Sequence, residues 1–159
     1  MSTAYISVSK EGISELDLSN ALPGSLIHRV TSSDAFTHII QVHVGDPDVE
    51  LPGIRRKIRK ILQVSRTMVF LVEEDHIWIG NFQKNRHAFV YIGSGTEEVF
   101  EKLVELRKDA EHYCLNVGKV IGRSGYFVVV RAAHAKHMPG AIHALRQLYR
   151  YVDVYEVST

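Results

Sequence analysis

One pattern of twelve residues occurs twice in the chain, as LPGIRRKIRKIL at residues 51–62 and as MPGAIHALRQLY at residues 138–149. Proline suits the first position of a helix, where its missing N–H would have no partner anyway, so Pro52 and Pro139 each predict a helix start. An apolar strand and a short polar loop precede both copies, and another apolar strand follows each. The chain is therefore predicted to contain one folding unit and a copy of it.

The elements around each copy are predicted to follow the order β-α-β-β-α-β. In the second half we expect strands at residues 88–92, 119–122, 126–132 and 152–157, with helices starting at Ser94 or Thr96 and at Pro139. In the first half we expect strands at 4–9, 26–30, 38–44 and 68–72, with helices at 13–22 and from Pro52, and an extra strand at 76–82 connects the halves. This is the ferredoxin-like pattern written twice.

The predicted fold class is therefore α+β, with two tandem ferredoxin-like halves whose antiparallel sheets carry helices on one face. The halves are expected at residues 1–75 and 88–159, joined by a strand and turn at 76–87, within one compact domain. The open face of each sheet is available for a twin half, a second subunit or a ligand. A homo-oligomer, most simply a homodimer, is expected.

The amino-acid composition restricts the broad class of the protein, but it does not indicate a reaction. Nineteen Lys and Arg against eighteen Asp and Glu leave a net charge of +1, so nucleic acid would need a local basic patch. The single cysteine excludes an intramolecular disulfide. Neither a signal peptide nor a membrane-spanning run is evident. These features predict a cytoplasmic protein.

The helix after Pro52 carries the densest group of positive charges. Its isoleucines take the buried face, which leaves Arg55, Arg56, Lys57, Arg59 and Lys60 on the solvent side. We expect Arg55, Arg56, Arg59 and Lys60 to bind an anionic ligand, such as a nucleotide or a nucleic-acid backbone, in a non-catalytic binding or regulatory protein. Helpers would be Lys84, Arg86 and Arg131. Alternatively, the basic helix pairs with the acidic helix that begins near Glu97, and the protein is an assembly component that docks through charged helices.

Two loops before the Pro-Gly helices support another reading, a small enzyme with its site in a cleft between the halves. One loop holds His43 and Asp46, and the other holds His134 and His137. These four residues could act as acid–base groups or ligate Zn, Mn or Fe. The alternative is that they serve as turn and capping residues. The residues identify no particular metal, cofactor or substrate.

A Gly93-Ser94-Gly95-Thr96 segment at a helix start could hold an anion through its backbone and through Ser94 and Thr96. It lacks the Lys-Ser/Thr pair of a P-loop, and a turn with a helix cap explains it equally. Cys114 is expected near the end of the helix that follows. No nucleophile motif surrounds it.

Overall fold

The computed structural model describes residues 2–9, 15–32, 36–62, 67–73, 86–109, 112–132 and 134–158. The first half contains β1 (Ser2–Val8), α1 (Glu15–Ala21), β2 (Leu26–Val30), β3 (His38–Val44), α2 (Pro47–Leu62) and β4 (Thr67–Glu73). The second half contains β5 (Arg86–Ile92), α3 (Glu97–Asp109), β6 (Tyr113–Val120), β7 (Tyr126–Ala132), the short 3-10 helix η1 (Ala135–His137), α4 (Met138–Arg146) and β8 (Val152–Ser158). Both halves follow the predicted β-α-β-β-α-β order, and the α+β prediction is confirmed.

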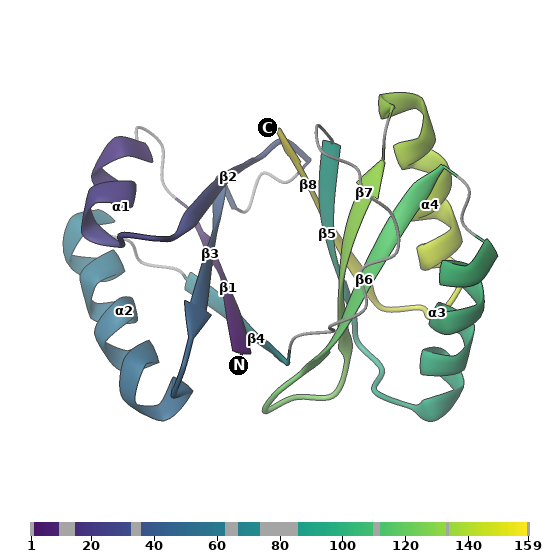
Figure 1. Cartoon of the computed structure of the whole chain (residues 1–159), viewed down its shortest axis with the longest axis horizontal. Coiled ribbons are helices and arrows are strands. Elements are labelled where there is room, and N and C mark those ends of the chain that lie inside the picture. Colours follow the sequence, from purple (N-terminus) through teal and green to yellow (C-terminus); the bar gives the residue numbers. More distant parts are fainter. Residues whose placement is uncertain are drawn as a thin grey trace.

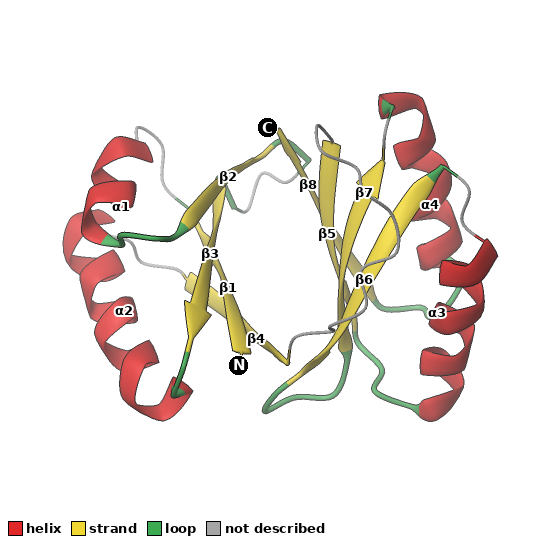
Figure 2. Ribbon diagram, viewed as in Figure 1, coloured by secondary structure: helices red, strands yellow, loops and turns green. Residues whose placement is uncertain are grey.

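The strands form one closed antiparallel barrel in the order β1-β3-β2-β8-β5-β7-β6-β4. Each half contributes a four-stranded sheet, and the two sheets face each other (Figure 1). The helices lie outside, α1 and α2 on the first sheet and α3 and α4 on the second (Figure 2). The sheet face that the sequence left open is therefore covered by the twin half within the same chain.

The two halves agree residue by residue in their strand register. Thr3 pairs with His43 and Val72, and His87 pairs in the same way with Arg131 and Val157. The two junctions between the halves also match. Val30 and Val157 pair at the β2–β8 junction, as Val120 and Val72 do at the β4–β6 junction. An approximate twofold axis through the barrel therefore relates the halves, and equivalent positions lie on opposite sides of it.

Each junction is short. Two residue pairs join β2 to β8, and two join β4 to β6. At the second junction Gly118 permits a close approach, because a Cβ there would lie 2.7 Å from the Glu73 carbonyl oxygen and would also overlap the Val72 side chain. A glycine in a strand commonly marks such a close backbone approach.

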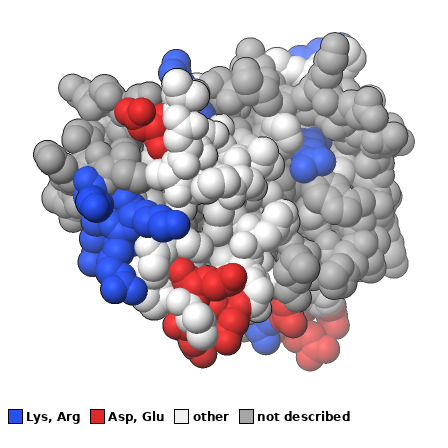
Figure 3. Space-filling model, turned by 60° about the vertical axis from the view of Figure 1, so that its left-hand side comes forward, with Lys and Arg blue, Asp and Glu red and all other residues white. Residues whose placement is uncertain are grey.

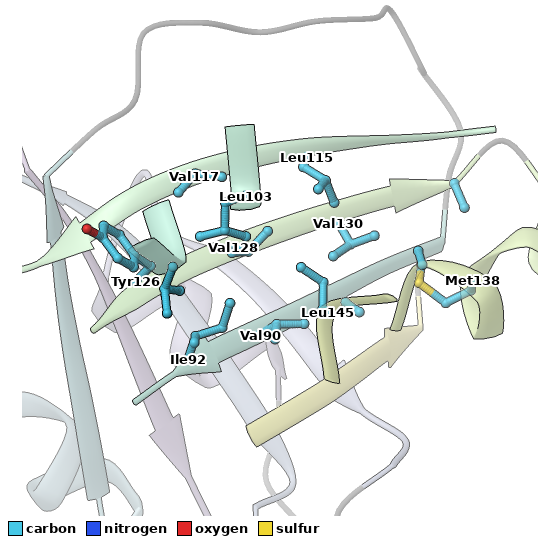
Figure 4. Close-up of a cluster of buried hydrophobic side chains, with 14 residues drawn as sticks. Val90, Ile92, Leu103, Leu115, Val117, Tyr126, Val128, Val130, Met138 and Leu145 are labelled. Carbon is cyan, nitrogen blue, oxygen red and sulfur yellow. The ribbon is translucent and has the colours of Figure 1, made fainter. Parts of the chain in front are cut away.

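Three apolar cores result from this arrangement. Side chains from the outer face of the first sheet pack under α1 and α2, around Ile6, Leu18, Ile40 and Ile58. The outer face of the second sheet packs under α3 and α4 around Leu103, Leu115, Val128, Val130 and Leu145 (Figure 4). The third core fills the barrel between the halves and is rich in aromatic rings. Strand alternation explains this division, because successive side chains point to opposite faces of a sheet.

Several element boundaries differ from the prediction. Helix α2 begins at Pro47, and Pro52 lies inside it, because Asp46 and Glu50 already cap the chain five residues before the predicted start. Strand β6 begins at Tyr113, so Cys114 lies in a strand rather than near a helix end. The predicted strand at 76–82 falls outside the described residues. The separate domain boundaries and the homodimer stay predictions.

No helix in the described part of the chain is both long enough and apolar enough to cross a lipid bilayer.

Candidate functional site

A group of polar side chains from β2 and β3 of the first half and from β5, β6 and β7 of the second faces the inside of the barrel. Register places them there, because each lies opposite another residue of the barrel interior. His28 lies opposite Ile39, and His87 opposite Val157. The group consists of His28, Gln41, His87, Cys114, Asn116 and Arg131. We call it the barrel cluster.

His28 contacts residues of both halves. Its Nε2 lies 3.0 Å from the Oε1 of Gln41. The edge of its ring meets the ring of Phe89, with centroids 5.0 Å apart at 70°. The His87 ring lies 6.3 Å away. His28 and Gln41 belong to the first half, whereas Phe89 and His87 belong to the second, so the imidazole bridges the two halves.

The environment of His28 disfavours its charged form. Burial lowers the pKa of His28 below its ordinary value, the hydrogen bond with Gln41 raises it in part, and the positive charge of Arg131 lowers it further. At neutral pH the imidazole is therefore uncharged, with one ring nitrogen able to accept a proton. A base that is neutral at its working pH is suited to removing a proton from a substrate.

Arg131 is a half-buried cation inside the barrel. It lies directly opposite Cys114 on β6 and His87 on β5. Burial lowers the pKa of Arg131, while the Cys114 thiol and the Tyr5 phenol act in the opposite direction. Guanidinium keeps its charge in proteins. The positive charge of Arg131 therefore acts on the His28 imidazole in surroundings where water screens it only in part.

Aromatic rings from both halves form the wall next to the cluster. The Tyr5 ring stacks on Phe127 with centroids 4.4 Å apart and lies 5.3 Å from Phe89. Phe70 lies 5.3 Å from Phe127 and 4.8 Å from Tyr91. Phe89 brings this aromatic wall into contact with the His28 ring. The half-buried exposure of His28, Gln41, His87 and Arg131 shows that solvent still reaches the cluster.

Two further polar groups face the barrel interior. The buried Oδ1 of Asn116 and the hydroxyl of Ser7, which is 1% exposed, make no hydrogen bond among the described residues. Buried polar groups normally have partners, and exceptions call for a specific reason such as a water or a ligand. Both groups could pair with a bound molecule.

The four residues predicted to be catalytic are not brought together. His43 lies near the end of β3 and Asp46 directly before α2, whereas His134 and His137 precede α4. The two segments lie on opposite sides of the barrel (Figure 1). A shared site of these four residues is therefore not formed. A catalytic role for any one of them stays a prediction.

Local contacts show what the first pair does in this structure. His43 is exposed, and its Nδ1 lies 3.2 Å from the Thr3 hydroxyl. The Oδ1 of Asp46 accepts a hydrogen bond from the backbone N–H of Asp48, and the Glu50 carboxylate accepts from the N–H groups of Gly45 and Asp46. Asp46 thus has the capping role that was the alternative reading of this loop.

The second pair belongs to a surface group of imidazoles. The rings of His137 and His112 are parallel, 4.2 Å apart, and the His134 ring lies 6.0 Å from that of His137. Burial and the neighbouring His112, Lys136 and His134 lower the pKa of His137. Among the described residues no three His, Cys, Asp or Glu side chains are grouped so as to hold a metal ion. The suggested metal site receives no support.

The basic helix lies outside the barrel. Arg55, Arg56 and Arg59 line a groove of about 470 Å³ between α2 and β4, and Lys and Arg gather on the face that Figure 3 shows. The acidic helix α3 covers the opposite sheet, so the two charged helices do not pair within the chain (Figure 1). Lys84 and the side chain of Arg86 lie outside the described residues. Of the predicted ligand-binding residues, only Arg131 belongs to the barrel cluster.

Ser94 and Thr96 act at the start of α3. The Thr96 hydroxyl accepts from the backbone N–H of Val99 at 3.4 Å, and the Ser94 and Thr96 hydroxyls lie 3.2 Å apart. Ser94 is 6% exposed. These contacts are those of a helix cap, with Thr96 as the capping residue.

The sequence did not indicate His28, Gln41 or His87 as site residues. Alternation within the predicted strands could have placed each on one face, but it could not say which face the other half would cover. Strand pairing within the second half already places His87 opposite Arg131, whereas only the closed barrel brings His28 and Gln41 into the same interior.

No protein-family model matches the chain, and no curated protein is similar to it in sequence. Solved structures are similar in fold. A mutant chlorite dismutase from Candidatus Nitrospira defluvii has a TM-score of 0.67 at 7% identity, covering 99% of this chain and 91% of that one. A proposed monooxygenase from Fusobacterium nucleatum has 0.55 at 12%, covering 99% and 90%. A regulator of staphylococcal pathogenesis has 0.57 at 12%, covering 99% and 98%.

These comparisons correct the main functional prediction. Two of these structures with the same two-half fold carry the names of enzymes, a chlorite dismutase and a monooxygenase. The prediction of a non-catalytic protein that binds an anionic ligand through its basic helix is therefore wrong, and nucleic-acid binding has no support. The alternative of a small enzyme with its site between the halves agrees better with these findings.

Proposed function

We propose that this protein is a small enzyme whose reaction takes place inside the barrel, at the barrel cluster, and starts with removal of a proton from the substrate by His28. The observation that carries the proposal is that the ring of His28, from the first half, lies 6.3 Å from the ring of His87, which stands directly opposite Arg131 in the second half. The charge of Arg131 acts on the His28 imidazole. Neither half contains both groups. The site is complete only when the barrel is closed.

His28 serves as the general base. Its burial and the nearby positive charge keep the imidazole neutral at neutral pH, as the lowered pKa indicates. The imidazole takes the proton, and the electron pair of the broken bond remains on the substrate as negative charge. A positioned base of this kind contributes about 10²–10⁴-fold to a reaction rate.

Arg131 stabilises the negative charge that forms. Its guanidinium is half-buried, so its attraction for an anion is screened less than at the protein surface. The base and the cation together favour a substrate that becomes an oxyanion on losing a proton. A small carbonyl compound with an acidic C–H bond meets this requirement, because its enolate carries the charge on oxygen.

The aromatic wall favours an apolar body on the substrate. The ring of Phe89 packs against the His28 imidazole, so the polar groups of the cluster lie next to the apolar side chains of the barrel core. Apolar walls with a few convergent polar groups are typical of small-molecule sites. We therefore expect a small carbonyl compound with an apolar substituent rather than a sugar or a nucleotide.

Proton abstraction can be measured without knowing the natural reaction. Pyruvate, acetone and phenylpyruvate are incubated with the protein in D₂O, and loss of the α-proton signal is followed by NMR. We expect exchange faster than in buffer for at least one compound, with phenylpyruvate favoured. His28→Gln should reduce that excess rate by about 100-fold or more, and Arg131→Gln by about 100-fold.

His143→Gln is the matched control, because His143 is exposed on α4, outside the barrel. It should exchange protons as fast as the wild type. Exchange no faster than buffer with all three compounds, or an unchanged rate in His28→Gln, would sink the proposal.

A further inference from the structure

Gln41 forms a hydrogen bond with His28 that proton removal by His28 does not itself require. We infer that Gln41 is a positioning residue that makes Nδ1 of His28 the proton acceptor of the barrel cluster. The catalytic role of Gln41 rests on the proposed function, whereas the hydrogen bond between Gln41 and His28 does not.

The hydrogen bond between the two side chains decides the tautomer. Nε2 of His28 and Oε1 of Gln41 lie 3.0 Å apart. A carbonyl oxygen can only accept a hydrogen bond, so Nε2 must carry the hydrogen. In a neutral imidazole the other nitrogen, Nδ1, then holds the lone pair. The ring is thus set in one tautomer before any substrate arrives.

The strands hold this pair in place. His28 lies opposite Ile39, and Gln41 lies opposite Leu26, so the two side chains are diagonal neighbours on one face of the β2–β3 pair. Long side chains reach each other across such a diagonal. On its other side Gln41 lies opposite Tyr5 of β1. The amide therefore stands between a phenol ring and the imidazole, both inside the barrel.

The second half of the chain is an internal control for the role of this pair. Register places Val129 at the position of Gln41, opposite Phe89, and Gly118 at the position of His28, opposite Phe127. The repeated fold is built there with no polar pair. Folding of the unit does not demand His28 or Gln41, and a specific polar contact kept in one half alone points to a role in the site.

The hydrogen bond also acts on the strength of the base. It raises the pKa of His28 against the lowering effect of burial, because an acceptor beside Nε2–H stabilises the protonated ring. Gln41 therefore does two things at one nitrogen. It selects the tautomer, and it keeps the buried imidazole basic enough to take a proton.

The test is Gln41→Val, which copies the residue that the second half has at this position. The tautomer and pKa of His28 are read from ¹⁵N NMR of labelled protein during a pH titration. In the wild type we expect the hydrogen on Nε2. In Gln41→Val we expect a mixture of tautomers, a lower His28 pKa, and α-proton exchange about tenfold slower near neutral pH.

Two further variants separate the loss of the hydrogen-bond acceptor from a change in packing. Gln41→Glu keeps an acceptor and adds negative charge, so it should retain the Nε2–H tautomer and raise the His28 pKa. Gln41→Met keeps the length without the acceptor and should repeat the effect of valine, which covers the case in which valine disturbs packing. Gln147→Val, at an exposed position after α4, is the matched control and should leave His28 unchanged.

The NMR readout separates this inference from the proposed function. Tautomer and pKa changes in Gln41→Val without any exchange activity in the wild type would support the positioning of His28 and overturn the proposed reaction. A wild-type His28 with hydrogen on Nδ1 would overturn the inference. Unchanged tautomer and pKa in both Gln41→Val and Gln41→Met would overturn it as well, even if His28→Gln abolishes exchange.

Discussion

The rings of Tyr5 and Phe127 stack inside the barrel with centroids 4.4 Å apart and planes 25° apart. Tyr5 belongs to β1 of the first half and Phe127 to β7 of the second. This contact joins the two sheets inside the barrel and adds to the short strand junctions at its edges. The aromatic core therefore helps to hold the two halves together.

Removal of the Phe127 ring should weaken that union. Phe127 is 1% exposed and contacts the rings of Tyr5, Phe70 and Phe89. We expect Phe127→Ala to lower the free energy of unfolding by about 3–5 kcal/mol, because it leaves a cavity that its neighbours fill only in part. Urea unfolding measures the change. Leu16→Ala, at a side chain 69% exposed, should change stability by no more than about 0.5 kcal/mol, and equal effects would contradict this account.

Gly118 should tolerate no side chain. A Cβ at this position would lie 2.7 Å from the Glu73 carbonyl oxygen and would overlap Val72, so β4 and β6 must separate to admit it. We expect Gly118→Ala to cost about 2 kcal/mol or more, as overpacking does. Gly140→Ala meets no atom within 4 Å in α4 and should be neutral or stabilising. Thermal unfolding of both variants tests the contrast, and a neutral Gly118→Ala would show that the junction is loose.

Stability should fall as pH drops through the range in which His28 becomes charged. Its folded-state pKa lies below the ordinary value of 6.5, so between those two values the unfolded chain binds more protons, and folding loses stability as pH falls. The lowered pKa of His137 also makes stability fall as pH drops, but solvent screening at this exposed ring makes its contribution smaller. Urea midpoints at about pH 7.5 and pH 5.5 should differ less in His28→Gln than in the wild type. An identical pH dependence would mean that His28 is not buried as described.

Tyr155 should ionise later than an ordinary tyrosine. Burial, followed by the charges of Asp153 and Tyr151, raises the pKa of Tyr155 to about 12. The folded state then holds a proton that the unfolded chain loses near pH 10, so this group's contribution to stability is complete below about pH 10 and disappears as pH rises toward 12. Ultraviolet titration of tyrosinate should lose its latest step in Tyr155→Phe. A late step that persists in this variant would assign it to another tyrosine.

Local patterns in the sequence predicted much of the fold. The repeated Pro-Gly segments, the helical spacing of isoleucine and leucine, and the strand-like alternation predicted two β-α-β-β-α-β halves, since each of these signals depends on residues close in the chain. Boundaries were harder to predict. Helix α2 begins at Pro47 rather than at Pro52. The Asp46 side chain accepts from the N–H of Asp48 in the first turn, and the Glu50 side chain accepts from the N–H groups of Gly45 and Asp46 before the helix.

The candidate site was beyond the reach of those patterns. His43, Asp46, His134 and His137 were grouped by their equivalent positions in the two copies, but the two segments that hold them lie on opposite sides of the barrel. Equivalent positions meet only near the twofold axis, as the rings of Tyr5 and Phe89 do at 5.3 Å.

Short-range periodicity and turn chemistry thus settled that the chain contains two copies of one α+β unit. The closure of the two sheets into a barrel settled which strand faces became interior, and with them the neighbours of His28. The physical reason is that a side chain's partner across a barrel depends on register between strands far apart in the chain, and no local periodicity encodes that register.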